Sequence, residues 1–372
     1  MFWRAIQAVR DFIKPTNNQR MERIAVIAIT KNGVKMAKEL KEKFPSWEVF
    51  APDKFSDDNK KINWYADNTT TKITELFKSN DALVCLFSLG AVVRLISPHL
   101  KDKKTDPAVI VIDDQAQFVI SALSGHLGGA NQLTNEIAEQ LGATPVITTA
   151  ADVNKTIAVD LVGKDLGWKI DDDSNVTKVS AFMVNAEKIG VYQNCGAKNW
   201  WQNKLPENVS TYSSLDGLKK SQSKGCLIIS DELINDNEIL ENAVIYRPPS
   251  LVVGIGLHWD TAKDKIIQGL DESLKKFNLS KKSIAKFVSI KKEKDVVGLN
   301  ELAEEMNIPL ELFDRVDLAT IITPNPSKMV EGYEGTASVS EAAAIKSSGG
   351  ILIVEKQKFP PDLTIAVARI QE

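Results

Sequence analysis

Short apolar segments that alternate with helix-like stretches constrain the fold of this chain more than any other feature. Arg23–Thr30 and Asp81–Phe87 are apolar through most of their length, as in strands that are covered on both faces. The stretch Met36–Phe44 between them repeats apolar residues at the spacing of one helix face. A similar alternation begins at Ser250. We therefore expect an α/β protein with two sandwich-like domains of mostly parallel sheets, joined by a smaller, variable α/β middle region.

Polar and proline-containing stretches indicate where the domains end. Arg247-Pro248-Pro249 is typical of a linker, and the region before it has only short predicted strands, such as Ile189–Gln193. The first segment has an amphipathic pattern, and we expect it to be dispensable to the chemistry, with Met21 as an alternative start. The predicted parts are an N-terminal extension over 1–20, an N-terminal domain over 21–152, a middle region over 153–249 and a C-terminal domain over 250–372.

The composition excludes several classes of protein. A net charge of −3 argues against general nucleic-acid binding, which needs a large excess of basic residues. No apolar run reaches the roughly 18–20 residues of a membrane-spanning helix. Cys85, Cys195 and Cys226 lie far apart without a Cys-x-x-Cys pair, so neither a disulfide framework nor a zinc site is indicated. We expect a cytoplasmic protein that contacts neither nucleic acid nor membrane.

A glycine-rich turn is the strongest candidate for a functional site. It follows the apolar run Phe118–Ala122, which we expect to pair with Ala108–Ile112 as a hairpin, and it precedes a helix-like pattern. Glycines let a backbone approach a ligand closely, and a helix N-terminus offers free N–H groups to an anion. The alternative is that the glycines only shape the turn and that the histidine makes a local hydrogen bond. The candidate residues of this turn are Ser124, Gly125, His126, Gly128, Gly129 and Asn131.

A second turn, Ser88–Gly90, also follows a predicted strand, and Gly90 is a candidate for substrate binding. In mostly parallel sheets ligands bind beyond the carboxyl ends of the strands, so we expect both turns to converge on one site. Arg94 suits a carboxylate because of its forked donor group. The basic residues that follow it, Lys101, Lys103 and Lys104, also fit a solvated loop.

Three further positions are candidates for substrate contacts. Thr148-Thr149 follows another apolar run and either binds a ligand or caps a helix. Gly254-Ile255-Gly256 ends a predicted strand of the C-terminal domain, where a lone Gly-x-Gly is a weak signal. Ser338 and Glu341 have the spacing of a capping box, so Glu341 serves either a helix end or a ligand.

Five stretches of the chain carry a further signal. They are Gly90–Ile96, Lys101–Ala108, Ser124–Asn131, Pro145–Ala150 and Ser338–Ala344. Together they resemble the cobalt-precorrin-5A hydrolase (CbiG) family of the anaerobic, early-cobalt branch of cobalamin synthesis. That family commonly has Cys-Arg-Arg-Gly after the Gly-Ile-Gly, whereas this chain has Leu257-His258-Trp259-Asp260. Two positive charges are thereby absent, and His258 is the residue that could replace one of them as a substrate contact.

The resemblance implies the reaction of that family. Water opens a lactone on ring A of a cobalt-containing, ring-contracted tetrapyrrole, a two-carbon unit leaves as acetaldehyde, and cobalt-precorrin-5A becomes cobalt-precorrin-5B. Lactone opening needs a base to activate water and donors to stabilise an oxyanion. We assign the base role to His126, the anion contacts to the backbone N–H groups of Leu127–Asn131, and the positioning of water to Ser124. The alternative role for His126 is ligation of the substrate's cobalt.

The resemblance also sets expectations for ligands and partners. Cobalt arrives with the substrate, so we expect neither a cofactor nor a metal ion held by the protein itself. The substrate is a flat, polyanionic cobalt-tetrapyrrole, which suits a cleft with local positive charge between two domains. A homodimer and contacts with other enzymes of the cobalamin pathway are compatible with the resemblance. Two competing functions are a non-catalytic carrier of corrinoid intermediates, favoured by the absent arginines, and a nucleotide-binding protein, which lacks a phosphate-loop lysine motif.

Overall fold

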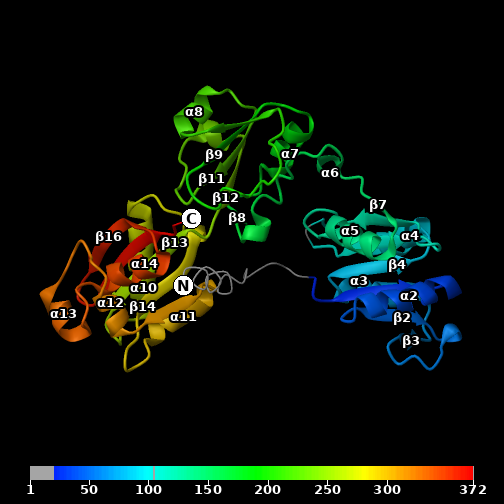
Figure 1. Cartoon of the computed structure of the whole chain (residues 1–372), viewed down its shortest axis with the longest axis horizontal. Helices are drawn as coiled ribbons and strands as arrows, with labels where there is room; N and C mark the ends of the chain where they lie inside the picture. The colour runs from blue at the N-terminus through cyan, green and yellow to red at the C-terminus, as the bar shows by residue number, and fades with distance from the viewer. Residues whose placement is uncertain (1–20, 104, 372) are drawn as a thin grey trace. The chain divides into compact units, whose positions relative to one another are not determined.

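The computed structural model describes residues 21–103 and 105–371, which contain three β-sheets flanked by helices (Figure 1). These residues divide into two compact units, 21–161 and 162–371. The expected α/β class with mostly parallel sheets is confirmed. The predictions for Met1–Arg20 and Lys104 lie outside the described residues. Among the described helices, none has both the length and the apolar character needed to cross a membrane.

The first unit is built on a seven-stranded sheet of described residues, in the order β3-β2-β1-β4-β5-β6-β7. Its strands are β1 (Ile24–Ala28), β2 (Glu48–Pro52), β3 (Asn63–Tyr65), β4 (Ala82–Leu86), β5 (Ala108–Ile112), β6 (Phe118–Leu123) and β7 (Thr144–Val146). Its helices are α2 (Lys31–Lys43), α3 (Thr69–Ser79), α4 (Leu89–Ile96), α5 (Ala130–Leu141) and α6 (Ala150–Val153), with 3-10 turns η1 (Asp53–Phe55) and η2 (Ser97–His99). Apolar residues of α2 and α5 pack on one face of the sheet, and those of α3 and α4 pack on the other. The strands form the middle of three layers, which is why they are apolar along their length.

The hairpin β5–β6 reverses the direction of this sheet. The strands β1 to β5 run parallel to one another, β6 is antiparallel to β5, and β7 is parallel to β6. The carboxyl ends of β6 and β7 therefore lie at the edge of the sheet where β4 and β5 begin. The predicted hairpin is confirmed. The expected convergence of Ser88–Gly90 with Ser124–Gly129 is wrong, because the two turns leave opposite edges of the sheet.

The middle part of the chain forms a second sheet, with five described strands in the order β10-β9-β11-β12-β8. The strands are β8 (Lys169–Ile170), β9 (Ile189–Gln193), β10 (Val209–Tyr212), β11 (Gly225–Ile229) and β12 (Ala243–Arg247). The helices are α7 (Val176–Val184), α8 (Leu215–Lys220) and α9 (Asn237–Leu240), with a 3-10 turn η3 (Lys164–Leu166). Neighbouring strands are parallel except β8, which is antiparallel to β12. The region that we expected to be variable thus has a sheet and an apolar core of its own.

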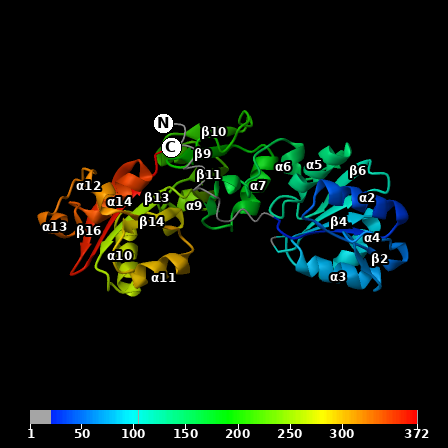
Figure 2. The same cartoon turned by 60° about the horizontal axis from the view of Figure 1, so that its bottom comes forward.

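The C-terminal part forms a third sheet, with five described strands in the order β15-β14-β13-β17-β16. The strands are β13 (Leu251–Leu257), β14 (Ile284–Ile290), β15 (Leu310–Phe313), β16 (Ile351–Phe359) and β17 (Leu363–Arg369). The helices are α10 (Lys263–Lys276), α11 (Val297–Met306), α12 (Arg315–Ala319), α13 (Lys328–Glu334) and α14 (Val339–Ser348), with a 3-10 turn η4 (Lys281–Ser283). Residues of α10 and α11 pack on one face of this sheet and those of α14 on the other (Figure 2).

Two glycines of β13 allow close packing, Gly254 against helix α14 and Gly256 against strand β17. A Cβ on Gly254 would lie 1.9 Å from the backbone oxygen of Ser340, and one on Gly256 would lie 2.5 Å from Oγ1 of Thr364. Only glycine leaves room for these contacts. Both glycines are buried under neighbouring elements, so close packing accounts for them without a ligand.

Buried charges connect the second and third sheets within the second unit. Asp231, just after β11, is fully buried. Its carboxylate accepts hydrogen bonds from Nε of Arg369 in β17 at 2.8 Å and from Nη2 at 2.6 Å. The hydroxyl of Ser250, directly after the predicted linker, donates to the same carboxylate at 2.7 Å. At the other end of the linker, Nη1 of Arg247 donates to the backbone oxygen of Ser230 at 2.9 Å, so polar contacts hold the linker at both ends.

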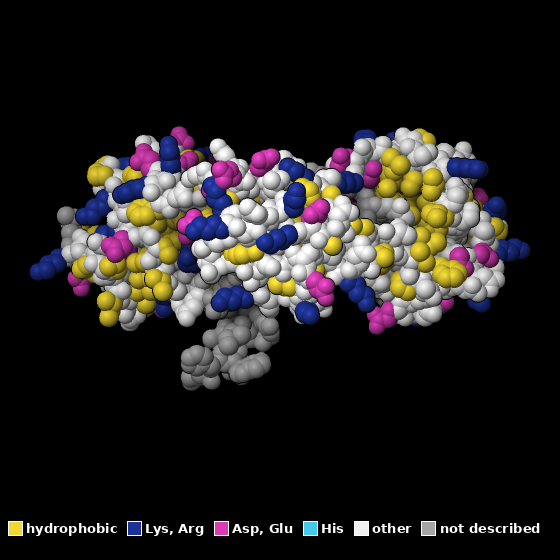
Figure 3. All heavy atoms as spheres, turned by 90° about the horizontal axis from the view of Figure 1, so that it is seen from above, with side chains coloured by type: hydrophobic (Ala, Val, Ile, Leu, Met, Phe, Trp, Pro, Cys, Tyr) yellow, Lys and Arg dark blue, Asp and Glu magenta, His cyan; other side chains and the backbone are white. Residues whose placement is uncertain are grey.

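Exposed apolar side chains gather on part of the surface of the first unit in the space-filling view (Figure 3). Leu89 and Val93 of α4 and Leu100 beyond it are among the exposed large apolar residues of this unit. Much of a folded protein's surface is contributed by apolar atoms, so these residues alone indicate no partner.

Candidate functional site

The candidate site lies beyond the carboxyl ends of β6 and β7. Because these strands are parallel neighbours, the segments that follow them leave the same edge of the sheet. Ser124 begins the glycine-rich turn with φ 56°, and Gly129 ends it with φ 81°, both in the left-handed region. A Cβ on Gly128 would lie 2.4 Å from Cβ of Ser124, so this position also requires glycine. The glycines therefore do shape the turn, as one of the two interpretations predicts.

His126 is held at both ring nitrogens by carboxylates. Its Nε2 lies 2.8 Å from Oδ2 of Asp152, and its Nδ1 lies 3.3 Å from Oδ1 of Asp160. The hydrogen bond to Asp160 is the main cause that raises the pKa of the imidazole above its ordinary value, the bond to Asp152 adds to it, and burial opposes both. Because carboxylates only accept hydrogen bonds, this arrangement favours the charged ring with a hydrogen on each nitrogen.

Asn131, in the first turn of α5, holds the segment that follows β7 against the glycine-rich turn that follows β6. Its Nδ2 donates to Oγ1 of Thr149 at 3.0 Å and to Oδ2 of Asp152 at 2.8 Å. Its Oδ1 accepts from the hydroxyl of Ser121 at 2.7 Å. A Cβ on Gly125 would lie 2.7 Å from that same Oδ1, so Gly125 leaves the space that the amide occupies. Asn131 is buried and fully engaged, and it places the carboxylate that His126 contacts.

Ser124 is engaged in a structural hydrogen bond. Its hydroxyl donates to the backbone oxygen of Asp106 at 2.9 Å. The carboxylate of Asp106 in turn accepts from the backbone N–H of Lys101 at 3.0 Å. The loop that carries Lys101 and Lys103 therefore reaches the same edge of the sheet as His126. This contact brings positive charge to the edge where the glycine-rich turn lies.

The backbone donors of the turn are mostly used by the turn itself. The N–H of Gly129 donates to the oxygen of His126, that of Ala130 to Ser124, and that of Asn131 to Gly125. These three groups cannot also bind an anion in this conformation. The anion contacts assigned to the backbone over Leu127–Asn131 are therefore contradicted for three of the five residues.

The other predicted residues of the first unit lie in different places. Gly90 is in the first turn of α4, at the opposite edge of the sheet from His126, with nothing near its Cα that a Cβ would contact. Arg94 is in the last turn of α4 and is exposed. Thr149 is the N-cap residue of α6 but makes no side-chain capping bond, because its hydroxyl pairs with Asn131 instead. Thr148 beside it is exposed.

Glu341 holds together two segments of the C-terminal part, which contains the third sheet. The expected capping box is wrong, because the hydroxyl of Ser338 makes no capping bond and is buried without a hydrogen-bond partner. The fully buried carboxylate of Glu341 instead accepts from Nδ2 of Asn325 at 2.8 Å and from the backbone N–H of Lys356 at 3.1 Å. Glu341 therefore fastens the loop before α13 to β16.

His258 lies immediately after β13, in the stretch where the expected arginines are absent. Its side chain is 57% exposed, and its Nδ1 pairs with the carboxylate of Asp260. It lies in the second unit and His126 in the first. Of the residues predicted in the C-terminal domain, His258 is the one with an exposed polar group available to a ligand.

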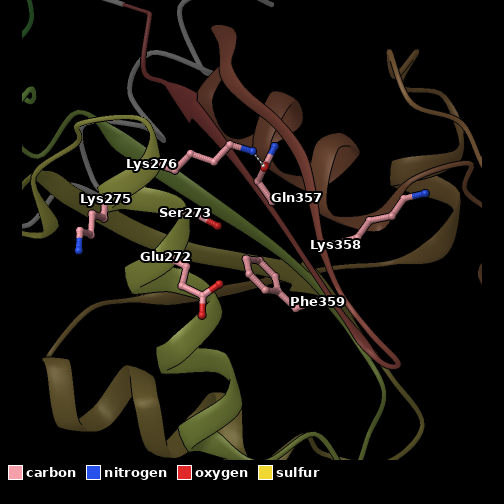
Figure 4. A pocket seen from close by; sticks show the side chains of 7 residues that line it. All are labelled: Glu272, Ser273, Lys275, Lys276, Gln357, Lys358 and Phe359. Carbon is pink, nitrogen blue, oxygen red and sulfur yellow. Dashed lines mark hydrogen bonds between the residues drawn. The ribbon is translucent and has the colours of Figure 1, made fainter.

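A hollow on the C-terminal part, beside the third sheet, contains none of the predicted site residues (Figure 4). It lies between α10 and β16, where Nζ of Lys276 donates to Oε1 of Gln357 at 2.8 Å. Its lining residues are Glu272, Ser273, Lys275, Lys276, Gln357, Lys358 and Phe359. The lining has no histidine or cysteine, and the hydroxyl of its Ser273 donates to the backbone oxygen of Gly269 at 2.7 Å.

Sequence reasoning missed the two carboxylates that contact His126. Asp152 closes the segment after β7, and Asp160 follows 34 residues after the histidine (126 to 160). A polar residue beyond the carboxyl end of a strand next to β6 was the available signal for Asp152. Nothing local marks Asp160. Among the described residues, neither these three side chains nor any other such group is arranged to hold a metal ion.

Comparisons with known proteins identify the family. Three family models match: Cobalamin synthesis G N-terminal over residues 71–152, Cobalamin biosynthesis central region over 157–248, and Cobalamin synthesis G C-terminus over 251–368. The chain is 41% identical to a cobalt-precorrin-5A hydrolase of Priestia megaterium, over 93% of this chain and 94% of that relative. The chain belongs to the CbiG family.

Other CbiG relatives cover the chain to a similar extent. A cobalt-precorrin-5A hydrolase of Salmonella typhimurium is 31% identical over 91% of this chain and 95% of the relative. A crystal structure of a cobalamin biosynthesis protein G homologue from Sulfolobus solfataricus is 24% identical, covers 94% of this chain and 98% of its own, and superimposes with a TM-score of 0.37. Within the CbiG regions, His126 and Asp152 fall in the N-terminal match, and Asp160 falls at the start of the central match.

Proposed function

We propose that this CbiG chain is a cobalt-precorrin-5A hydrolase of anaerobic cobalamin synthesis. It opens the ring-A lactone of cobalt-precorrin-5A with water and releases acetaldehyde, which gives cobalt-precorrin-5B. The names of the two bacterial relatives, which match over more than nine-tenths of the chain, support the proposal. Loss of acetaldehyde breaks a carbon–carbon bond, so the proposed enzyme is a hydrolase that acts on carbon–carbon bonds.

The observation that carries the proposal is the histidine with a carboxylate on each ring nitrogen. Opening a lactone requires a group that takes a proton from water and a group that keeps that base in the correct tautomer. Asp160 is the less exposed carboxylate, at 19% against 42% for Asp152, and it bonds to Nδ1 of His126. We assign to Asp160 the role of holding the hydrogen on Nδ1, which leaves Nε2 as the basic nitrogen.

Asp152 is the carboxylate that substrate and water replace at Nε2. It is the more exposed of the two, and Asn131 keeps its Oδ2 within the site when the histidine is released. The neutral ring then takes a proton from water, whose oxygen attacks the lactone carbonyl while the ring C–O bond breaks. The proton passes to the alkoxide oxygen, which gives an alcohol still attached to the macrocycle. Loss of that O–H proton then forms the C=O of acetaldehyde while the C–C bond to the macrocycle breaks and leaves its electron pair on the macrocycle. Ser124 is proposed to hold the turn rather than to act as a nucleophile, because its hydroxyl is engaged by Asp106.

The cobalt in this proposal is part of the substrate. We propose that the protein itself holds no cofactor and no metal ion. The basic residues Lys101 and Lys103, which lie on the loop tied to Ser124 through Asp106, are proposed to meet carboxylates at the edge of the tetrapyrrole. A homodimer and contacts with other enzymes of the pathway stay predictions.

The test is anaerobic turnover of cobalt-precorrin-5A, followed by mass spectrometry and by chemical trapping of acetaldehyde. We expect the wild-type protein to lose the two-carbon unit, and His126→Gln to lower kcat about 100-fold or more, because a general base contributes on the order of 10²–10⁴-fold. His99→Gln is the matched control, since His99 lies in the same unit and bonds to the hydroxyl of Thr74. Its turnover should equal that of the wild type.

Other outcomes would assign other functions. Tight binding of the corrinoid without a change in mass would contradict the enzyme and favour a carrier of corrinoid intermediates, for which the altered Leu257–Asp260 stretch is the specific observation. Equal turnover by wild type and His126→Gln would remove the base assignment and leave the reaction in place. Thermal stabilisation by a nucleotide, without binding of corrinoid, would favour the nucleotide-binding alternative.

A further inference from the structure

The three histidines of the chain differ in what their ring nitrogens contact. His126 has a carboxylate on each nitrogen. His99 shares its Nε2 with the hydroxyl of Thr74 at 2.8 Å. His258 is bonded at Nδ1 by Asp260, and its Nε2 has no hydrogen-bond partner among the described residues. His258 is exposed over 57% of its side chain, whereas His126 and His99 are partly buried, so His258 is the histidine best placed to present a ring nitrogen to a ligand.

Asp260 determines which nitrogen of His258 carries the hydrogen. An ionised carboxylate only accepts, so the hydrogen lies on Nδ1 and the lone pair of the neutral ring lies on Nε2. Histidines that ligate metal ions almost always donate their other ring N–H to a carboxylate, a carbonyl or water, which fixes the ring and raises its basicity. The pair His258–Asp260 has this arrangement without a metal ion of its own.

The loop that carries His258 is fixed to the third sheet. The backbone N–H of His258 donates to the oxygen of Asp362 at 3.0 Å, and that of Thr261 donates to the oxygen of His258 at 3.2 Å. The hydroxyl of Thr261 donates to Oδ2 of Asp362 at 3.0 Å. These bonds hold both ends of the loop to the turn before β17. The ring of His258 therefore projects from a rigid support.

The surface beside His258 suits a flat, anionic molecule. Trp259 is 47% exposed, and its ring centroid lies 5.6 Å from that of His258. Nζ of Lys294 lies 4.8 Å from the centroid of the Trp259 ring. Val297 is also exposed, next to Gly298, which packs against the backbone of Thr261 and Lys263. An indole with an ammonium group over its face offers apolar area to the plane of a tetrapyrrole and positive charge to its edge carboxylates.

We propose that Nε2 of His258 is an axial ligand to the cobalt of the bound corrinoid. The inference rests on the proposed function, because it takes the cobalt-tetrapyrrole as the ligand. The lone pair of Nε2 forms a cobalt–nitrogen bond, a water molecule on that axial position leaves as water, and the oxidation state of cobalt does not change. His258 thereby positions the substrate and takes no part in proton transfer.

The test is the electron paramagnetic resonance spectrum of cobalt(II)-precorrin-5A, frozen anaerobically with the protein in excess. One axial nitrogen ligand splits each cobalt line into three, and an oxygen ligand leaves the lines unsplit. We expect the split spectrum with the wild type and with His99→Gln, and its loss with His258→Gln. Asp260→Asn should keep the splitting but weaken corrinoid binding about 10- to 100-fold, the range seen when an outer partner of a ligating histidine is removed.

The outcomes separate this inference from the proposed function. Acetaldehyde release with an unsplit spectrum, or with a splitting that His258→Gln keeps, overturns the ligand role and leaves the hydrolase intact. A splitting that is lost with His126→Gln and kept with His258→Gln assigns the cobalt to the other histidine and also overturns it. A splitting lost only with His258→Gln, but without acetaldehyde release from the wild type, supports the ligand and overturns the hydrolase.

Discussion

The protonation state of His126 is determined by two carboxylates that are far away in the sequence but in contact with its ring. A solvent-exposed histidine is mostly neutral at pH 7. Asp160 and Asp152 raise the pKa of this ring and favour its charged form. The base role then depends on displacement of Asp152 by substrate, whereas Asp160 keeps the ring oriented. The residue type is visible in the sequence, and its protonation state follows from its neighbours.

The titration of His126 predicts how stability changes with pH. Its pKa in the folded protein lies above the ordinary value of 6.5, so protonation stabilises the folded state. That contribution is complete below about pH 6.5 and disappears as the pH rises through the raised pKa. Thermal unfolding from pH 6 to 9 should therefore show wild type and His126→Gln furthest apart in Tm at the acidic end. A difference that grows toward alkaline pH would contradict the assignment.

At the scale of elements, the packing of helix α14 on β13 depends on Gly254. The backbone oxygen of Ser340 occupies the place where a Cβ of Gly254 would lie. The Gly-x-Gly of this strand therefore serves close packing of a helix on a sheet. Such a contact explains a glycine motif without a ligand.

Gly254→Ala tests this packing. A methyl group 1.9 Å from a backbone oxygen forces α14 away from the sheet, and overpacking of a core costs about 1–3 kcal/mol. We expect the second unit to unfold at a lower urea concentration, and circular dichroism measures the midpoint of that transition. Gly332→Ala in α13 is the control, because a Cβ there meets nothing within 4 Å. An unchanged midpoint for Gly254→Ala would show that α14 does not sit against β13 as described.

At the scale of the whole molecule, Asp231 links the second sheet to the third. Its fully buried carboxylate is matched by Arg369, whose side chain is partly exposed, and by Ser250. Removing one partner of a buried ion pair leaves a charge without compensation, which costs more than replacing both partners by apolar groups. The two members of the pair are therefore not equivalent under mutation.

Arg369→Met should destabilise the second unit by about 3–5 kcal/mol, because it leaves the carboxylate of Asp231 buried without its guanidinium. The double variant Asp231→Leu with Arg369→Met should recover a large part of that loss. Urea unfolding of both variants, at equal protein concentration, measures the difference. A double variant no more stable than Arg369→Met would contradict the cost assigned to the unpaired carboxylate of Asp231.

The local elements of this fold were predictable because their causes are local. Apolar runs identified β1, β4 and the hairpin β5–β6, and the shaping of the turn after β6 by its glycines was one of two open interpretations. The direction of β6 decides at which edge of the sheet the following turn lies, and the sequence pattern does not predict that direction. It moves the turn at His126 to the edge opposite Gly90.

The sequence by itself determined the α/β class, the CbiG resemblance and the histidine at the centre of the candidate site. Tertiary structure decided its partners: Asp152 and Asp160 reach His126, Asn131 fixes Asp152, and Glu341 serves the loop at Asn325. The physical reason is the distance along the chain over which each interaction acts. Periodicity and turn chemistry act over a few residues, whereas the pairing of strands determines which loops share an edge of a sheet.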